Sequence, residues 1–348
     1  MNFLKNLFSK EESKLQTKIV AIGGFCWSGS GAVVDFLSEF DNTKIFANQN
    51  ISSVNTVDIN KTKGNEFKFF IDKHSIFNLE KAFKASKIEQ DIAIKQFLEF
   101  LYGKINFDES NEVFNKNLYK ITIEFLENIL DLSEDTKSYM KDKEYPYTLY
   151  GKNPEDYTNC SFVHGGLAFY NFKKMSKNDF DLHIKNYINN FFNNINSDKK
   201  LVFDQMFSYD TMLDKMNIYM DESPIKEICV YRDPRDQYYS WYKETPKTDI
   251  LKTPDKFIEF YKKKVLLKIN SASKNRLCIR FEDLVLDYGK TTKQIMDFLG
   301  LKEENHVAPK TIFDPEISKV NIGAWKYFID QDLIKKIGYE LKEYCYNM

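Results

Sequence analysis

Short apolar runs that suit buried strands alternate with stretches of helical spacing along most of the chain. The first run, at 17–25, ends in glycine and is followed by a small-residue loop and by the helical pattern of 32–40. Similar runs, each ahead of a polar loop, are found at 201–203, 228–231 and 277–279. Strands that alternate with helices predict a parallel sheet covered on both faces. We therefore expect an α/β fold with a parallel central sheet flanked by helices.

The pattern changes between 76 and 200, where the chain is rich in Asn, Lys, Phe and Tyr. Stretches such as 92–101 and 119–130 have helical periodicity. A linker rich in proline or glycine, which would mark a separate domain, is not seen in the sequence. We expect residues 1–348 to form a single domain with a mainly helical insertion at 76–200.

The charge balance excludes a surface devoted to nucleic acid or anionic lipid, because 50 basic residues face 51 acidic ones. The longest uncharged stretch, 19–34, is broken by glycines and too short to span a bilayer. The start of the chain lacks the apolar core of a secretion signal. Its apolar residues 3, 4, 7 and 8 fit one face of a short helix, which would dock on the protein itself or touch a membrane surface peripherally.

The five cysteines are scattered and form neither a CxxC motif nor a metal-type pair. This spacing favours a reducing, cytoplasmic location and implies no metal. Only four of the basic residues are arginine: Arg232, Arg235, Arg276 and Arg280. A guanidinium grips phosphate or carboxylate with two parallel bonds, which lysine cannot do. We therefore expect chemistry or tight pairing in the two segments that hold them.

The loop after the first predicted strand places small residues between a strand and a helix. Backbone N–H groups in such a loop, together with the start of a helix, can hold an anion. Gly24 and Gly29 have the GxxxxG spacing of a nucleoside-triphosphate-binding P-loop, but Ser30 stands where that motif has lysine. A phosphotransferase is therefore disfavoured, and an ordinary strand-to-helix turn remains the simpler alternative.

The segment YRDPRDQYYSWY predicts a second anion-binding element. Arg232 ends an apolar strand, Pro234 turns the chain, and Ser240 follows on the next helix. One guanidinium and one hydroxyl can then converge beside the carboxyl edge of the sheet, where open α/β sheets bind ligands. The alternative is that Arg232 and Asp236 form a structural salt bridge.

Taken together, these segments resemble the cytosolic-type sulfotransferase family, which uses 3'-phosphoadenosine 5'-phosphosulfate (PAPS) and has a P-loop nucleotide-binding type of fold. That family has a first loop in which a Lys or Arg precedes Ser-Gly, and a later RxPxDxxxS motif. Here these are the WSGSG loop and the Arg232–Ser240 segment. RFEDL with a later FLGL, and the GAWK sequence at 323–326, are two further matches. The resemblance covers 17–45 and 200–327.

The resemblance implies a set of residues that bind PAPS. The product, adenosine 3',5'-bisphosphate (PAP), would occupy the same site. The set is Trp27, Ser28, Gly29, Ser30, Gly31, Ala32, Arg232, Ser240 and Lys319. Two positions depart from the family pattern. Trp27 replaces the cation that would neutralise charge on the leaving phosphate, and Ser318-Lys319-Val320 replaces a common Arg-Lys-Gly.

Transfer to an acceptor needs a base within hydrogen-bond reach. Glycan-directed family members use a glutamate on the strand after the first helix, and 66–70 (EFKFF) is our candidate for that strand, with Glu66 and Lys68 on one face. A solvent-exposed charge pair is the alternative interpretation. Asp204, at the end of a predicted strand, is the second candidate, although it could equally cap the helix that follows.

We expect a cytoplasmic sulfotransferase that moves a sulfuryl group from PAPS to a hydroxyl of a saccharide or glycolipid acceptor, with the insertion shaping the acceptor pocket. The rival hypotheses are a non-catalytic nucleotide-binding or scaffold protein on the same fold, which Trp27 favours, and a P-loop phosphotransferase. The sequence leaves the oligomeric state open.

Overall fold

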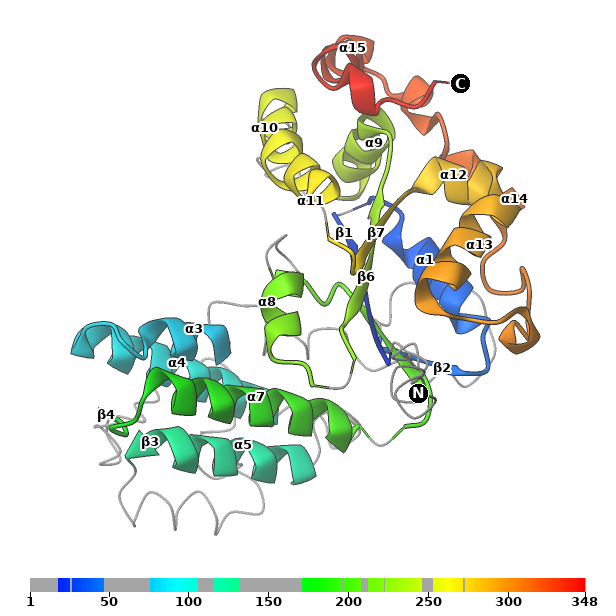
Figure 1. The fold of residues 1–348 in the computed structure, drawn as a ribbon. Helices are drawn as coiled ribbons and strands as arrows, with labels where there is room; N and C mark the ends of the chain where they lie inside the picture. The colour runs from blue at the N-terminus through cyan, green and yellow to red at the C-terminus, as the bar shows by residue number, and fades with distance from the viewer. Residues whose placement is uncertain are drawn as a thin grey trace, which may run out of the picture. The chain divides into compact units, whose positions relative to one another are not determined.

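A five-stranded parallel sheet forms the centre of the fold, with the strand order β2-β5-β1-β6-β7 (Figure 1). The computed structural model describes residues 18–46 except 26, 76–105, 116–131, and 171–347 except 196, 208–211, 222, 246–252 and 272. The strands are β1 (Ile19–Gly24), β2 (Thr43–Phe46), β5 (Lys200–Asp204), β6 (Lys226–Tyr231) and β7 (Arg276–Arg280). All four pairings between them are parallel. The carboxyl ends of these strands therefore meet at one edge of the sheet.

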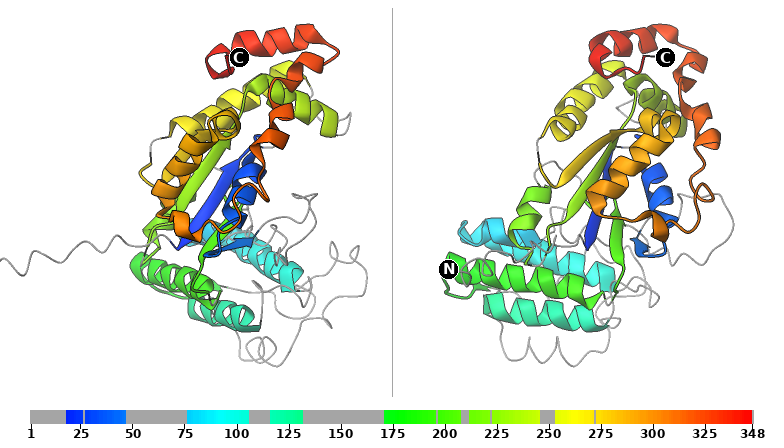
Figure 2. Two further views of the ribbon diagram at one scale, coloured as in Figure 1. Left: turned by 90° about the vertical axis from the view of Figure 1, so that its right-hand side faces the viewer. Right: turned by 45° about the vertical axis from the view of Figure 1, so that its right-hand side comes forward.

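One face of the sheet carries the larger hydrophobic core. Ile22, Ile228 and Ile279 pack there against α1 (Ser30–Ser38) and α13 (Tyr288–Leu299). The short helix α12 (Phe281–Leu286) follows β7 on the same side (Figure 2). Gly300, with φ of +66°, ends α13, because glycine adopts the left-handed conformation at little cost.

A second core joins the helices near the C-terminus, where Tyr238, Phe257, Tyr261 and Ile334 are buried together. They come from α9 (Pro234–Glu244), α10 (Pro254–Phe260), the π-helix η5 (Tyr261–Val265) and α15 (Gln331–Glu340). The remaining helices of this part are α8 (Met212–Ile218), α11 (Leu266–Asn270), α14 (Pro315–Ser318), η6 (Glu303–Asn305), η7 (Lys319–Asn321), η8 (Ala324–Tyr327) and η9 (Lys342–Tyr344).

The chain divides into two compact units, 1–64 with 197–348 and 65–196. The first unit holds the sheet. The second is mainly helical, with α3 (Ile76–Ala82), α4 (Lys87–Ile105), α5 (Lys116–Ile129), α7 (Lys177–Asn194), and the two-residue strands β3 (Leu130–Asp131) and β4 (Asn171–Phe172). Within it, α5 packs on α7, and a buried hydrogen bond of 3.0 Å joins Thr122 Oγ1 to Tyr187 Oη.

The predicted fold class is confirmed, because a parallel sheet flanked by helices is present and the helices α3, α4, α5 and α7 fall in the segment expected to be a helical insertion. Strand β2 was not predicted, because it is only four residues long and contains a lysine. The strand predicted at 66–70 and the amphipathic start of the chain lie outside the described residues. The prediction of a single domain with an insertion at 76–200 stays a prediction.

Candidate functional site

The small-residue loop turns sharply between β1 and α1. Ser28 N–H donates to the carbonyl of Phe25 over 2.7 Å, and Gly29, with φ of +89°, is the residue before α1. A Cβ at Gly29 would clash with the ring of Phe281, so both the conformation and the space require glycine. Ala32 N–H donates back to the Gly29 carbonyl over 3.1 Å. The helix therefore begins at Ser30 and Gly31, at the carboxyl edge of the sheet.

Ser28 lies under this turn with its hydroxyl unsatisfied. Its side chain is 1% exposed, and Oγ has no hydrogen-bond partner among the described residues. A buried hydroxyl without a partner costs free energy, so such groups usually point to an absent ligand or water. The first N–H groups of α1 also have no partner within the helix. The loop thus combines an unused hydroxyl with a helix start, which is a suitable site for an anion.

Trp27 contributes its backbone rather than a charge. Its φ is +59°, and its ring lies 5.3 Å from the ring of Trp241 on α9. Its carbonyl accepts a hydrogen bond of 3.3 Å from Arg232 Nη1. The left-handed backbone costs about 1 kcal/mol or more for a residue with a Cβ. Because the indole packs on α9 and carries no charge, this position of the loop has no cation.

Arg232 is the point where three segments meet. Nη1 donates to Ser240 Oγ over 3.2 Å as well as to Trp27, and Nη2 donates to the carbonyl of Asn321 in η7. The side chain is 5% exposed, and within the described part of the chain its Nε–H has no partner. Burial lowers the pKa of the guanidinium, while Asp236, Glu282 and Asp233 oppose this effect. The structure thus brings together Arg232 and Ser240, as the spacing predicted, and adds the carbonyls of Trp27 and Asn321.

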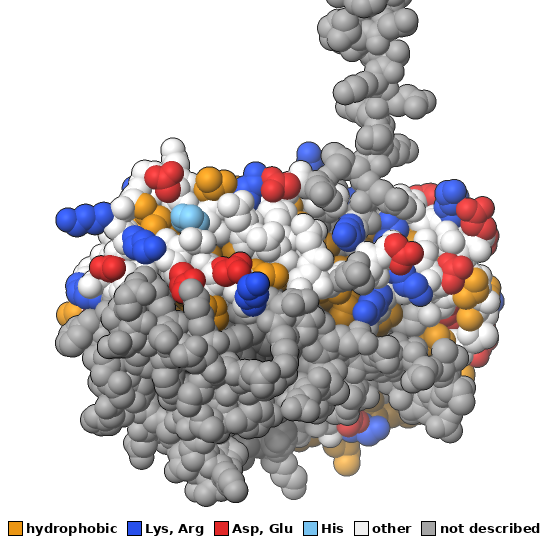
Figure 3. Space-filling view, turned by 90° about the horizontal axis from the view of Figure 1, so that it is seen from below, with side chains coloured by type: hydrophobic (Ala, Val, Ile, Leu, Met, Phe, Trp, Pro, Cys, Tyr) orange, Lys and Arg blue, Asp and Glu red, His pale blue; other side chains and the backbone are white. Residues whose placement is uncertain are grey.

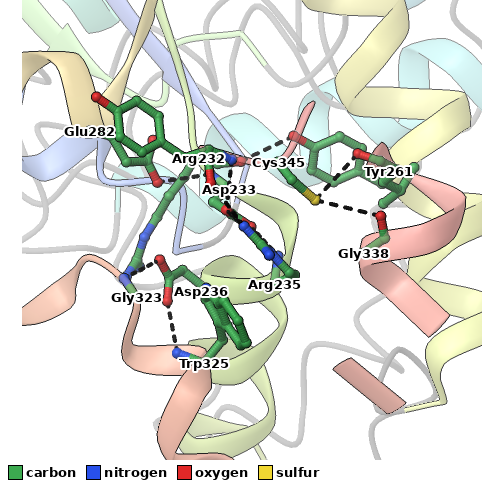
Figure 4. A network of polar contacts seen from close by, with 12 residues as sticks. Arg232, Asp233, Arg235, Asp236, Tyr261, Glu282, Gly323, Trp325, Gly338 and Cys345 are labelled. Carbon is green, nitrogen blue, oxygen red and sulfur yellow. Dashed lines mark hydrogen bonds and ion pairs between the residues drawn. The ribbon is translucent and has the colours of Figure 1, made fainter. Parts of the chain in front are cut away.

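Asp236 fixes the C-terminal loop to this arginine turn. Its two carboxylate oxygens accept from the N–H groups of Gly323 and Trp325 over 2.8 and 2.9 Å (Figure 4). Burial raises the pKa of Asp236, and Arg232 counteracts this effect. The Asp236 carboxylate thus binds two backbone N–H groups, and its charge also acts on the nearby Arg232 guanidinium.

Two more carboxylates hold the same turn from the other side. Asp233 accepts from Arg235 Nη2 over 2.6 Å, and its N–H donates to Glu282 Oε1 over 2.9 Å (Figure 4). Glu282 is fully buried, and burial raises its pKa to about 7. Tyr261, from the π-helix, donates through its hydroxyl to the Arg232 carbonyl over 3.1 Å. The backbone of Arg232 is thereby held on both sides.

Lys319 is close in sequence to this site, but its ammonium is used elsewhere. Nζ lies 2.6 and 2.7 Å from the two carboxylate oxygens of Glu316, one helical turn earlier. Lys319 and Glu316 are both exposed. The Asn321 carbonyl, two residues later, is the atom of this segment that Arg232 contacts.

Asp204 lies at the end of β5, in register with Ile22 of β1. It is 4% exposed, and burial raises its pKa to about 6. The next residue, Gln205, has a φ of +53°, and its Nε2 donates to Ser30 Oγ over 2.8 Å. The side chain of Gln205, the residue after Asp204, therefore links the end of β5 to the first residue of α1.

Gln205, Asn321 and Glu282 are not among the residues predicted for the site. Gln205 follows a strand end just as Arg232 does, so the rule that carboxyl ends of parallel strands meet at one edge would have drawn attention to it. Asn321 acts through its carbonyl, which no residue type reveals. The other two candidates for the catalytic step, Glu66 and Lys68, lie outside the described residues.

Comparison with known proteins assigns the family. The family model described as "Sulfotransferase domain" matches residues 93–316, more than half of the chain. The chain belongs to this sulfotransferase family. The match includes the arginine turn and RFEDL, whereas the small-residue loop precedes it. It also runs through 93–200, for which the sequence analysis noted no resemblance.

Two solved structures are similar to this sulfotransferase. The sulfotransferase domain of the olefin synthase from Synechococcus PCC 7002 is 12% identical, with a TM-score of 0.42 and coverage of 96% of each chain. The sulfotransferase domain from the curacin biosynthetic pathway is 17% identical, with a TM-score of 0.31 and coverage of 65% of this chain and 86% of that one. No curated protein matches the chain.

Charged side chains of both signs lie on the described surface of this sulfotransferase. In Figure 3, basic and acidic side chains are interspersed over the described part of the face shown. Among the described residues, no group of three or more His, Cys, Asp or Glu could hold a metal ion. Within the same part of the chain, none of the helices has the length and apolar character needed to cross a bilayer.

Proposed function

We propose that this sulfotransferase uses PAPS as its sulfuryl donor and transfers the group to a hydroxyl of a saccharide or glycolipid. The observation that carries the proposal is the double contact of Arg232, which bonds the Ser240 hydroxyl and the Trp27 carbonyl at once. This contact joins the two segments that the family uses for the two phosphate-bearing ends of the nucleotide. The same place holds two buried donors, Ser28 Oγ and Arg232 Nε, that have no partner in the portion of the chain that the structure describes. These donors fit an anionic ligand.

The residues have separate roles in this proposal. The loop from Ser28 to Ala32 and the start of α1 would hold the 5'-phosphosulfate, because backbone N–H groups there face the carboxyl edge of the sheet. Arg232 and Ser240 would hold the 3'-phosphate through charge-assisted hydrogen bonds. Lys319 would contribute only if it exchanged its Glu316 partner for the nucleotide.

The reaction is an in-line displacement at sulfur. A bond forms from the acceptor oxygen to sulfur as the bond from sulfur to the phosphate oxygen breaks, and the acceptor proton passes to a protein base. Asp204 suits this role, because a carboxylate with a pKa of about 6 is ionised at neutral pH yet more basic than an ordinary aspartate. Glu66 and Lys68 remain candidates for the base and for a cation near the reacting group.

The acceptor class rests on the resemblance and on the aromatic-rich insertion at 76–200, which we propose shapes the acceptor pocket. Several aromatic side chains of this segment are not available to stack on a sugar. Phe97, Phe125, Phe180 and Tyr187 are buried in the core of their own unit. Sugar stacking would therefore depend on other aromatic residues of the insertion. We further propose a cytoplasmic location, without nucleic acid as a partner.

One observation favours a second function, a non-catalytic nucleotide-binding or scaffold protein. Trp27 occupies the place of the family's cation, and its ring packs on Trp241. A loop without that cation can still bind an anion but stabilises a leaving phosphate less well.

The two functions are separated by binding and transfer measurements on the same sample. Thermal shift with PAP, and with ATP plus magnesium as the comparison, reports whether the site accepts the bisphosphate. Transfer of labelled sulfate from PAPS to a panel of glycans and glycolipids then reports catalysis. We expect stabilisation by PAP and transfer to at least one acceptor. Stabilisation by ATP and magnesium alone would contradict the proposal, while PAP binding without transfer would support the scaffold function.

A further inference from the structure

The peptide group that joins Arg232 to Asp233 is held at both of its polar ends by buried side chains. Its carbonyl, on Arg232, accepts a hydrogen bond of 3.1 Å from the Tyr261 hydroxyl. Its N–H, on Asp233, donates to Glu282 Oε1 over 2.9 Å. Figure 4 shows Tyr261 and Glu282 approaching this stretch of main chain from different sides. Because both side chains are fully buried, water does not compete for either bond.

The two side chains come from elements that are far apart from the arginine turn in the sequence. Glu282 is the second residue of α12 and belongs to the RFEDL motif, to which the proposed function gives no role. Tyr261 begins the π-helix η5, and π-helical turns are frequent at functional sites. Burial raises the pKa of Tyr261, so its hydroxyl keeps the proton that it donates. The next residue in the turn, Pro234, adds a third restraint, because the residue before a proline is confined to extended backbone, and Asp233 has φ of −46° and ψ of 121°.

These restraints act on the main chain and leave the Arg232 guanidinium to other partners. Within the described residues, the carboxylates of Asp233 and Asp236 bond to backbone N–H groups and to Arg235. The guanidinium donates instead to the Ser240 hydroxyl and to two carbonyls, which are all neutral acceptors. Charge-assisted hydrogen bonds from a guanidinium to a phosphate are stronger than bonds to neutral acceptors. The guanidinium is therefore held in place and can still bind a phosphate.

We propose that Glu282 and Tyr261 are positioning residues for the 3'-phosphate, because they fix the peptide group from which the Arg232 side chain projects at the end of β6. The inference rests on the proposed function, since it names what orients the phosphate-binding arginine of that same site. Loss of either hydrogen bond would leave a buried polar group of the main chain without a partner, and the peptide group would rotate to find one. The guanidinium lies several bonds from Cα, so a small rotation of the main chain displaces it by a larger distance.

Two ligands isolate this effect, because adenosine 5'-monophosphate (AMP) lacks the 3'-phosphate that PAP has. The ratio of their dissociation constants, measured by isothermal titration calorimetry, reports what the 3'-phosphate contributes to binding. In Glu282→Ala the Asp233 N–H loses its acceptor, and we expect PAP to bind about tenfold more weakly while AMP binding changes less than about twofold. Removal of a negative charge would by itself favour the 3'-phosphate, so weaker PAP binding does not come from charge.

Glu282→Gln is the conservative variant, because the oxygen of its amide can still accept from the Asp233 N–H. We expect the preference for PAP over AMP to be kept or increased in it. Tyr261→Phe gives a second route to the same measurement if Glu282→Ala does not fold. It removes only a hydroxyl, and we expect PAP to bind several-fold more weakly while AMP binding is kept.

Glu39 provides the matched control. It is also fully buried and also accepts from backbone N–H groups, those of Ile312 and Phe313, but it lies at the opposite end of α1 from the small-residue loop. Glu39→Ala should lower the unfolding midpoint and leave the ratio of the two dissociation constants unchanged.

A merely structural role of Glu282 predicts that PAP and AMP binding weaken together, because the whole site would loosen. A parallel loss of this kind, or unchanged affinities in folded Glu282→Ala and Tyr261→Phe, overturns the inference. A Glu282→Gln variant that loses the preference for PAP as completely as Glu282→Ala also overturns it, because the hydrogen bond can form there. If the unmodified protein itself binds no PAP, the proposed function fails and the inference fails with it.

Discussion

Gln205 Nε2 donates a hydrogen bond of 2.8 Å to Ser30 Oγ, and so joins the end of β5 to the first residue of α1. Gln205 has a φ of +53°, a conformation that a residue with a Cβ adopts at a cost of about 1 kcal/mol. Its backbone N–H also donates to the carbonyl of Ile22 over 2.8 Å. The preceding side chain, Asp204, is thereby held at the carboxyl edge of the sheet beside the loop. Strain at this position is typical of a site whose geometry matters for function.

Asp204→Asn tests the assignment of the base. We expect the rate of sulfuryl transfer to fall by about 100-fold or more, because the amide cannot accept the acceptor proton. The affinity for PAP should remain within about twofold, since Asn keeps the shape of the side chain and removes a negative charge near an anion. Steady-state kinetics and calorimetry measure the two quantities. A variant that transfers sulfate at the original rate would exclude Asp204 and direct attention to Glu66, for which Glu66→Gln is the matched variant.

The pH dependence of transfer gives an independent test of the same residue. The base must be ionised, and burial raises the pKa of Asp204 to about 6. We therefore expect kcat/KM to fall as pH decreases below about 6 and to reach a plateau above it. In Asp204→Asn this acidic limb should be absent from the residual activity. An identical limb in the variant would mean that another group titrates.

Stability should depend on pH through the same carboxyl. The folded state binds the Asp204 proton more tightly than the unfolded chain does, because the pKa is raised from 3.8 to about 6. Its favourable contribution is complete below pH 4 and is lost as pH rises through about 6. At pH 7 to 8 the buried carboxylate then costs about 3 kcal/mol, so Asp204→Asn should raise the free energy of unfolding by about that amount. Urea unfolding at pH 4 and pH 8 measures the difference in the free energy of unfolding between Asp204→Asn and the unmodified protein. This difference should be small at pH 4.

Arg232→Lys tests the arginine turn. The guanidinium bonds Ser240, Trp27 and Asn321 simultaneously, whereas an ammonium has no planar fork with which to do so. We expect a loss of about 2 kcal/mol in PAP binding, which is a factor of about 30. Arg280→Lys is the control, because Arg280 lies against the rings of Tyr231 and Tyr346. Unchanged PAP affinity in a folded Arg232→Lys variant would remove Arg232 from the site.

Gly29→Ala tests whether the loop geometry is essential. Alanine at a φ of +89° is strained, and its Cβ would clash with Phe281. We expect the free energy of unfolding to fall by about 2 kcal/mol or more. Gly289→Ala is the matched control, because a Cβ there meets no atom within 4 Å. It lies within α13, so alanine should stabilise the protein by about 0.5 kcal/mol. Thermal unfolding separates the two, and equal effects would show that neither strain nor space is decisive at Gly29.

Much of the sheet could be predicted because its strands are buried on both faces. The runs at 17–25, 201–203, 228–231 and 277–279 each coincide with an observed strand, since continuous apolar residues are required there. β2 (Thr43–Phe46) could not be found in this way. It has only four residues, one of them a lysine, and it is fixed by pairing with β5 rather than by its own pattern.

The site was predictable where spacing alone determines geometry. Arg232 at a strand end and Ser240 on the next helix converge because of the turn at Pro234, and the contact of 3.2 Å follows. The role of Lys319 could not be foreseen, because its ammonium pairs with Glu316 and its segment approaches Arg232 through the carbonyl of Asn321. The link from β5 to α1 through the Gln205 side chain also could not be predicted, because Gln205 has a positive φ, for which the sequence gives no signal.

Trp27→Lys tests what the departure from the family pattern costs. Lysine at this position would place a cation in the loop, where negative charge develops on the leaving phosphate, and a donor of this kind is worth about 100-fold in rate. We expect transfer to accelerate by at least tenfold, because the backbone strain at φ of +59° is the same for both residues. Trp27→Met is the matched control, as it also removes the contact with Trp241 but adds no charge. If Trp27→Met accelerates transfer as much as Trp27→Lys does, the gain comes from loss of the indole and not from the added charge. No gain in either variant would contradict the prediction.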